Sequence, residues 1–388
     1  MDMSKERETR KDIDQRRDRL LASLALTSGV GLALALPFAL KAGAEFFLPL
    51  TAAIVIAIAL VPFLEWMERR RIPSALAALV CLIAFLVVAN TALVLIIVPA
   101  TDWFRVLPER IGHIQANLSP LIDFYSQLQK FIDETLQMLA SGPVAAAQTV
   151  AVEAPRSLLQ LAATSAPAAI VQMMFAMLVI YFFLAGWSRL RRNAIQSRDS
   201  FNGAMAMAQV IQKLVEATSA YVLTISVINL CLGLSVAIAL ALIGMPSPLM
   251  WGGIVALLNF IPYFGPVLAA VLLGLGGLMV FDNIWMALAP AAVQIACHLV
   301  EANMITPLVL GRKLTMNPIL ILISLSFWGW VWGTPGALLA VPLLIIVQTV
   351  ISAAGKPDIA GFLFEQGTLT AVPRRENLDN EDSGAEES

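Results

Sequence analysis

Two long apolar stretches lie between residues 250 and 351, and prolines and glycines break each of them near its middle. The first break reads NFIPYFGP at 259–266, and the second reads WVWGTPG at 330–336. Proline lacks a backbone donor and clashes with the preceding turn, so neither stretch can form one uninterrupted membrane helix. Irregular backbone at bilayer depth is tolerated only where protein buries it or a polar cavity solvates it. Each break therefore requires a folded environment within the membrane.

The composition indicates a membrane protein. Of the 388 residues, 59% are hydrophobic and 13% are charged, against roughly 45–50% and about 25% in soluble domains. We therefore expect an all-α polytopic membrane protein. The net charge of −2 argues against nucleic acid as a partner, because phosphate binding needs a clustered excess of Lys and Arg.

Eight segments are apolar enough to lie in the membrane. A helix needs about 17–25 apolar residues to span a bilayer, and six runs meet this length: 20–40, 46–64, 74–99, 166–187, 218–243 and 284–310. The broken segments 250–280 and 317–351 bring the number to about eight. We expect five regions: a charged cytoplasmic N-terminus (1–19), three spans (20–99), an extracytoplasmic helical segment (100–165), a transport block (166–351) and a disordered acidic cytoplasmic tail (352–388).

Lys and Arg cluster before the first span, at 69–71 and at 189–198. Cytoplasmic loops carry an excess of these residues, so the N- and C-termini should face the cytoplasm.

In 100–165, apolar residues at helical spacing predict two amphipathic helices with a break at Ser119 and Pro120. These helices either lie on the membrane surface or form an oligomer contact or a lid. Residues 201–216 predict a cytoplasmic amphipathic helix that leads into the fifth span.

Charge placement favours two re-entrant hairpins. If 250–280 enters from outside and returns there, the next span delivers Arg312 and Lys313 to the cytoplasm, as the positive-inside bias requires. By the same reasoning 317–351 enters and leaves on the cytoplasmic side. The C-terminal half then contains an inverted repeat, in which a span and a hairpin occur twice in opposite orientation. Eight simple crossings, with two kinked long helices, are the alternative.

Polar residues in the sixth run share one helical face. Gln294, His298 and Glu301 are spaced i, i+4 and i+7. Ionisable groups inside a membrane are costly and are functional candidates, and this His and Glu are suited to share a proton. The alternatives are a polar contact between helices or subunits, or a Glu301 at the inner interface.

The first break offers polar groups to a small solute. Asn259 and Tyr263 supply an amide and a hydroxyl, and Asn229 lies in the preceding span. The alternative role of these groups is to satisfy the backbone that the break leaves unpaired. The HExxH, Walker A and GxSxG motifs are absent, so we expect no enzyme, no metal site and no cofactor.

The motifs resemble those of the autoinducer-2 exporter family, also described as a PerM-like permease family. NFIPYFGP at 259–266, EANMITPLVLG at 301–311, Pro318 and GTPGA at 333–337 occur in this order. The resemblance covers about residues 20–351. It implies a homo-oligomer, with a pentamer expected, in the cell inner membrane. It also implies export of a small polar signalling molecule, while some relatives are assigned cation/proton antiport.

We interpret the chain as a secondary transporter that exports a small polar solute, such as autoinducer-2, by alternating access. Its expected partners are membrane lipid, the solute, and protons or monovalent cations. The alternatives are a cation/proton antiporter of the same family and a non-transporting membrane scaffold. The expected pathway residues are Asn229, Asn259, Pro262, Tyr263, Gly265, Pro266, Gly333, Pro335 and Gly336. The expected coupling residues are Gln294, His298 and Glu301, and the further motif residues are Asn303, Pro307, Gly311 and Pro318.

Overall fold

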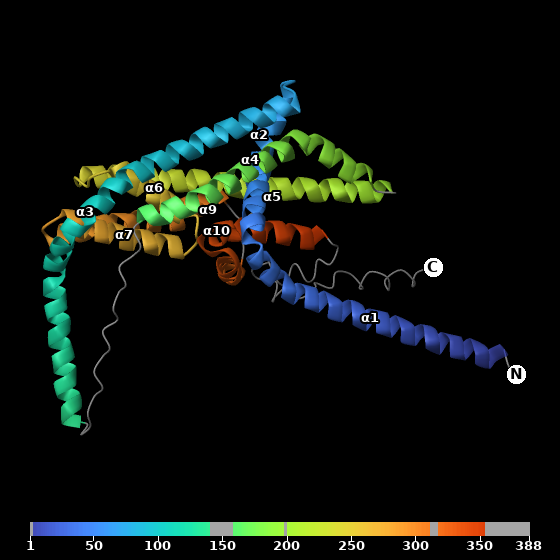
Figure 1. Ribbon diagram of the computed structural model, residues 1–388, viewed down its shortest axis with the longest axis horizontal. Helices are drawn as coiled ribbons and strands as arrows, with labels where there is room; N and C mark the ends of the chain where they lie inside the picture. The colour runs from blue at the N-terminus through green and yellow to red at the C-terminus, as the bar shows by residue number, and fades with distance from the viewer. Residues whose placement is uncertain (1–2, 140–157, 198–199, 311–316, 354–388) are drawn as a thin grey trace, which may run out of the picture.

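The computed structural model describes residues 3–139, 158–197, 200–310 and 317–353, and no β-strand occurs within these ranges. The helices, all but α8 and η1 labelled in Figure 1, are α1 (Met3–Ala42), α2 (Ala44–Arg69), α3 (Ser74–Leu139), α4 (Leu158–Gln196), α5 (Phe201–Leu242), α6 (Pro248–Leu258), α7 (Phe264–Val280), α8 (Ile284–Val300), the π-helical turn η1 (Glu301–Ile305), α9 (Thr306–Leu310) and α10 (Pro318–Ala353).

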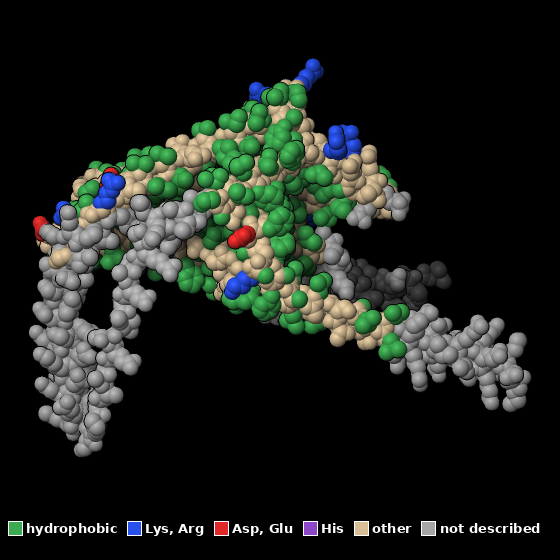
Figure 2. All heavy atoms as spheres, viewed as in Figure 1, with side chains coloured by type: hydrophobic (Ala, Val, Ile, Leu, Met, Phe, Trp, Pro, Cys, Tyr) green, Lys and Arg blue, Asp and Glu red, His purple; other side chains and the backbone are tan. Residues whose placement is uncertain are grey.

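The helices have the length and composition of membrane spans. Seven of those described contain an apolar segment long enough to cross a bilayer, while α6 and α7 are shorter apolar helices. Hydrophobic side chains cover much of the face shown in Figure 2, and charged side chains occupy only a few places on it. The chain is therefore an all-α polytopic membrane protein, as its composition predicts.

Helix α3 differs from the sequence prediction. It runs from Ser74 to Leu139 as one helix, so the break predicted at Ser119 and Pro120 is wrong. A proline inside a helix removes one hydrogen bond, and this bends many helices without ending them. Figure 1 shows α3 changing direction between a first part beside the other helices and a last part that extends away from them. Residues 140–157 and 354–388 of the predicted segments lie outside the described residues.

Helices α2 and α3 pack against α4 and the first half of α5. Their shared core includes Ala57 of α2, Ala77 of α3 and Leu184 of α4, each fully buried. Arg191 of α4 adds polar links at one end of this core. Its Nη1 lies 3.2 Å from Oε1 of Glu65 in α2, and its Nη2 donates to Oε1 of Gln212 in α5 at 3.2 Å. α5 is continuous, so the predicted amphipathic helix and the fifth span are one element.

α6 and α7 form an antiparallel helical hairpin. Trp251 near the start of α6 packs closely against Gly276 near the end of α7, and Pro246 and Val280, at the open end, line the same cavity. The 11 residues of α6 and the 17 of α7 give lengths of about 17 and 26 Å. Both lengths are below the roughly 30 Å of a bilayer core.

α10 folds back on itself at Gly333. This residue has φ +65° and ψ −145°, a combination that only glycine adopts readily. The hydroxyl of Ser324 in the first arm donates to the carbonyl of Ala340 in the second at 2.8 Å. Nε1 of Trp332, beside the fold, donates to the carbonyl of Leu40 in α1 at 3.0 Å. That each hairpin enters and leaves the membrane on one side stays a prediction.

Candidate functional site

The two helix breaks meet inside the protein. Ile261, in the turn of the first hairpin, belongs to a buried cluster with Leu325, Ala337 and Ala340 from the two arms of α10. Trp328, one turn before the second break, packs against the same cluster. Apolar contact between the breaks shields irregular backbone from lipid, which the energetics of a membrane require. The contact therefore joins the two segments that the sequence marks as candidate pathway.

The turn of the first hairpin has an unusual backbone. Tyr263 has φ +66° and ψ −49°, and the Phe264 amide donates to the Pro262 carbonyl at 2.8 Å. Together these features define a γ-turn with positive φ, which is rare and strained for a residue with a side chain. The Tyr263 side chain is exposed at the surface of the chain. The chain thus stores backbone strain at the tip of a predicted pathway element.

Both hairpins close through a glycine that faces a backbone carbonyl. A Cβ at Gly265 would lie 1.9 Å from the oxygen of Leu258, and a Cβ at Gly336 would lie 2.0 Å from the oxygen of Trp328. Gly265 and Pro266 lie in the first turn of α7, just after the turn in which we expected them. Pro335 is exposed, whereas Gly336 is buried. Each break is therefore tight because one position has no side chain.

A pair of asparagines connects the first break to α5. Asn259, the C-cap of α6, donates from Nδ2 to Oδ1 of Asn229 at 2.8 Å. Asn229 is 1% exposed, and its own Nδ2 has no hydrogen-bond partner among the described residues. A buried amide without a partner has lost its hydrogen bonds to water and has gained none in return, which lowers the stability of the fold. The structure thus brings two predicted pathway residues together and leaves one donor available.

Gln294 is a second buried amide with unused hydrogen-bonding capacity. It is fully buried, and neither Oε1 nor Nε2 has a partner in the part of the chain that the structure describes. α7 and α8 pack in opposite directions, with Gly277 facing the Ala287 carbonyl and Gly274 facing Ala291. Gln294 lies one turn beyond Ala291, and therefore nearer the first hairpin turn.

Glu301 is buried within a polar cluster at the end of α8. It is 4% exposed, and its Oε1 accepts a hydrogen bond from the Thr306 hydroxyl. Its Oε2 lies 3.1 Å from Nδ1 of His298. This His298 nitrogen lacks hydrogen-bond geometry toward any described partner, so the contact depends on charge when the imidazole is protonated. A buried carboxylate needs such partners because burial of an isolated charge is costly.

A π-helical turn begins at Glu301, and the sequence prediction of one regular run from 284 to 310 missed it. The Thr306 amide donates to the Glu301 carbonyl, a spacing of five residues. Pro307 follows and has no amide for the Asn303 carbonyl. π-helical turns are rare and occur frequently at functional sites. The Thr-Pro pair at 306–307 was the sequence signal that favoured this local change.

Some predicted motif residues are exposed or form hydrogen bonds with residues nearby in the sequence. Asn303 is exposed and donates from Nδ2 to the carbonyl of Leu299 at the end of α8, at 2.8 Å, and Pro307 is exposed as well. Pro318 opens α10 directly after Asn317, whose side chain accepts from the Ile319 amide at 3.0 Å. Gly311 lies outside the described residues. Asn303 and Pro318 therefore have local structural roles in this conformation.

The fold and the site define a polytopic membrane protein of the permease class, with two broken helical hairpins and buried polar side chains. The chain belongs to the AI-2E transporter family, whose profile, described as AI-2E family transporter, matches residues 29–356. It is 29% identical to the AI-2 transport protein TqsA of Escherichia coli (strain K12), over 88% of this chain and 96% of that protein. It is 24% identical to YhhT of the same strain, over 80% and 85% of the two chains. It is 25% identical to YrrI of Bacillus subtilis (strain 168), over 79% and 85%.

Proposed function

We propose that this protein is a secondary transporter that exports a small polar solute, such as autoinducer-2, across the cell inner membrane. The observation that carries the proposal is the pair of buried amides, Asn229 and Gln294, whose polar atoms are left without a partner among the residues that the structure describes. Polar groups in such a place are costly and are functional candidates. The similarity to TqsA, which is named for AI-2 transport, supports the solute class.

The solute-binding site that we propose lies beside the turn of the first hairpin. Amide side chains both donate and accept hydrogen bonds, so Asn229, Asn259 and Gln294 suit the hydroxyl and carbonyl groups of a small polar solute. The bond between Asn259 and Asn229 occupies two of these groups when no solute is bound. Solute would exchange for this bond and thereby act on the position of the hairpin turn.

Alternating access would come from movement of the two hairpins against the N-terminal spans. The hairpins share the cluster around Ile261 and Ala337, so motion of one break is transmitted to the other. The strained turn at Tyr263 and the fold at Gly333 are the points where backbone angles can change. In this proposal both hairpins are re-entrant and form an inverted repeat, and both chain termini face the cytoplasm.

Proton coupling is the mechanism that we propose for Glu301. Its two carboxylate oxygens contact Thr306 and His298, so gain or loss of a proton changes both contacts. The π-helical turn places this change directly before α9 and the second hairpin. A protonated Glu301 would need no counter-charge, whereas an ionised one would be stabilised by a protonated His298. This observation also supports cation/proton antiport as the second candidate function.

Solute counterflow in proteoliposomes tests the transport function. Purified protein would be reconstituted with unlabelled autoinducer-2 inside, and uptake of labelled autoinducer-2 would be followed over time. We expect transient accumulation that requires internal solute, with no such signal in protein-free liposomes. Absence of counterflow for autoinducer-2 and for chemically related polyols, with correctly assembled protein, would refute the proposed solute class. A homo-oligomer, with a pentamer expected, is the assembly to reconstitute.

A further inference from the structure

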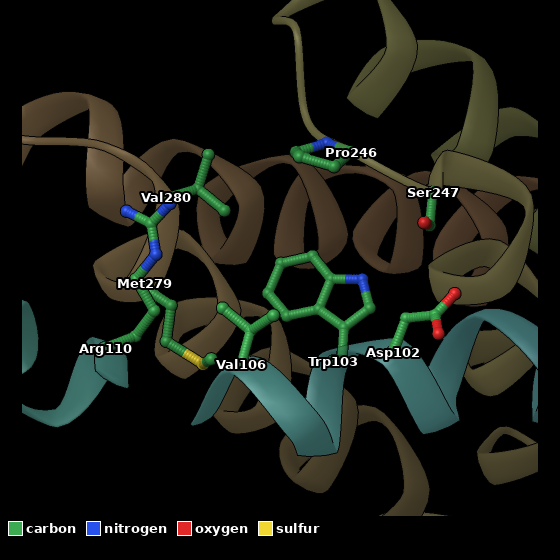
Figure 3. Close-up of a pocket in the computed structure, with 8 residues that line it drawn as sticks. All are labelled: Asp102, Trp103, Val106, Arg110, Pro246, Ser247, Met279 and Val280. Atoms are coloured by element: carbon green, nitrogen blue, oxygen red, sulfur yellow. The ribbon is translucent and has the colours of Figure 1, made fainter. Parts of the chain in front are cut away.

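A cavity of about 300 Å³ lies at the open end of the first hairpin, apart from the amides described above. Trp103 and Arg110 of α3 line it from one side, and Ser247, Met279 and Val280 of the hairpin line it from the other (Figure 3). The Trp103 ring also packs edge-on against Trp251, with centroids 5.1 Å apart. The cavity therefore lies between α3 and the base of a hairpin that we propose to move.

A second groove, of about 380 Å³, continues from this cavity. Ser247 lines both, and the groove is otherwise formed by apolar residues, including Val94 and Val98 of α3 and Leu249 of α6. The α3 stretch from Val94 to Arg110 covers 16 residue steps, or about 24 Å of helix. This length exceeds one leaflet of a bilayer core of about 30 Å. The cavity and the groove together form one cleft along α3, and this cleft is long enough to hold one acyl chain.

The order of groups along α3 matches the order of groups in a lipid leaflet. The apolar span in this helix ends at Trp103, so Val94 and Val98 lie within it and Arg110 lies beyond it. Figure 3 shows the Arg110 guanidinium beside Val280 at one end of the cavity, and Asp102 at the other end beside Ser247. The apolar end of the cleft is thus at hydrocarbon depth, and the cationic end is past the end of the span.

The two ends of the cavity carry opposite charges. Arg110 is half-buried, and guanidinium groups bind phosphate through paired hydrogen bonds. Asp102 is exposed at the other end of the cavity, beside Ser247 where the groove begins, and disfavours a second anionic group there. Ser247 precedes α6, and its side chain makes no capping hydrogen bond to that helix, so its hydroxyl is available to a ligand. The cleft suits one anionic head at Arg110 and one apolar chain toward Val94.

We propose that this cleft binds an anionic phospholipid, with its phosphate at Arg110 and one acyl chain in the groove beside Val98. The bound lipid fills the space between α3 and the open end of the hairpin, and so stabilises their contact. Phosphatidylglycerol is the probe that represents this chemistry. This site is independent of the amides that we propose for solute transport, so its loss would leave the solute-binding groups in place.

Native mass spectrometry of the full-length protein, after exchange into phosphatidylglycerol and washing with detergent, tests the site. We expect retained phosphatidylglycerol in the wild type and about tenfold weaker retention in Arg110→Gln, a loss typical of one charge-assisted contact. Val98→Trp, which fills the groove, should also reduce retention. Arg105→Gln removes an exposed arginine on the same helix that does not line the cavity, and it should retain lipid as the wild type does.

Three results would overturn the proposal. The first is equal retention in Arg110→Gln and wild type. The second is an equal loss in Arg105→Gln, which would mean that general surface charge holds the lipid. The third is full displacement of phosphatidylglycerol by equimolar phosphatidylethanolamine or oleate, which would mean that headgroup charge or the phosphate is not recognised.

Discussion

Asn259 at the end of α6 donates a 2.8 Å hydrogen bond to the side-chain oxygen of Asn229 in α5. This bond directly links the turn of the first hairpin to the long helix that precedes it. Asn229 is almost completely buried, and its Nδ2 has no hydrogen-bond partner in the described part of the chain, so the link is polar, internal and incompletely satisfied there. A small polar solute can accept a hydrogen bond from this Nδ2. The effect of the asparagine pair on solute transport can therefore be measured.

Gln294 should show opposite effects on stability and on transport. Substitution by methionine keeps the shape of the side chain and removes two buried polar atoms that have no partner within the described ranges. We expect Gln294→Met to raise the free energy of unfolding by about 1 kcal/mol and to lower the rate of solute counterflow. Thermal unfolding in detergent and counterflow in proteoliposomes measure the two effects. Unchanged transport in a stabilised variant would leave Gln294 without a role in the pathway.

Glu301→Gln should abolish the pH dependence of transport and leave the assembled protein intact. Glutamine retains an oxygen that can accept from the Thr306 hydroxyl, but it cannot exchange a proton. Counterflow rates between pH 5.5 and 8.5, together with the oligomer mass, provide the measurement. Glu45→Gln, at an exposed position in α2, is the matched control and should behave as wild type. An identical pH profile in Glu301→Gln and wild type would contradict proton coupling at this residue.

Two glycines should be intolerant of a single methyl group. Gly265→Ala and Gly336→Ala would place Cβ atoms about 2 Å from backbone oxygens, so each hairpin must open. We expect each substitution to lower the free energy of unfolding by about 1–3 kcal/mol. Gly329→Ala is the control, because its added Cβ would meet no neighbouring atom of the described residues within 4 Å. Equal melting temperatures for all three variants would show that the close approaches do not determine hairpin stability.

The topology of the first hairpin can be tested at its open end. In a background with Cys81, Cys231 and Cys297 replaced by alanine, Ser247→Cys and Val280→Cys should both react with a membrane-impermeant maleimide added from outside the cell. The reason is that both residues line one cavity and the charge pattern predicts that this end lies outside. Labelling of the two positions from opposite sides of the membrane would instead establish simple crossings.

Local chemistry allowed the helix breaks to be predicted from the sequence. Pro262 and Gly333 each prevent a continuous regular helix through their own backbone properties, and the breaks occur beside them. The same reasoning failed at Pro120, because a proline can bend a long helix instead of ending it. The spacing of Gln294, His298 and Glu301 identified a polar helical face. The close approach of His298 to Glu301 agrees with that spacing.

Contacts between distant residues could not be predicted in this way. No local pattern places Ile261 against Leu325 and Ala340, because that contact depends on how two hairpins dock. The link between Asn229 and Asn259 spans 30 residues and depends on the packing of α5 against α6. The π-helical turn depends on the bond from the Thr306 amide to the Glu301 carbonyl, which a regular helical periodicity does not contain.

The half-saturation concentration of autoinducer-2 counterflow in the Asn259→Ala variant tests the central claim most directly. If the asparagine pair contacts the solute, this concentration should rise about tenfold, as expected for one lost buried hydrogen bond, while the oligomer stays assembled. Asn90→Ala is the matched control, since Asn90 is exposed in α3 and donates to the Leu86 carbonyl of its own helix at 2.8 Å. A half-saturation concentration in Asn259→Ala equal to those of wild type and Asn90→Ala would contradict a solute site at the first hairpin turn.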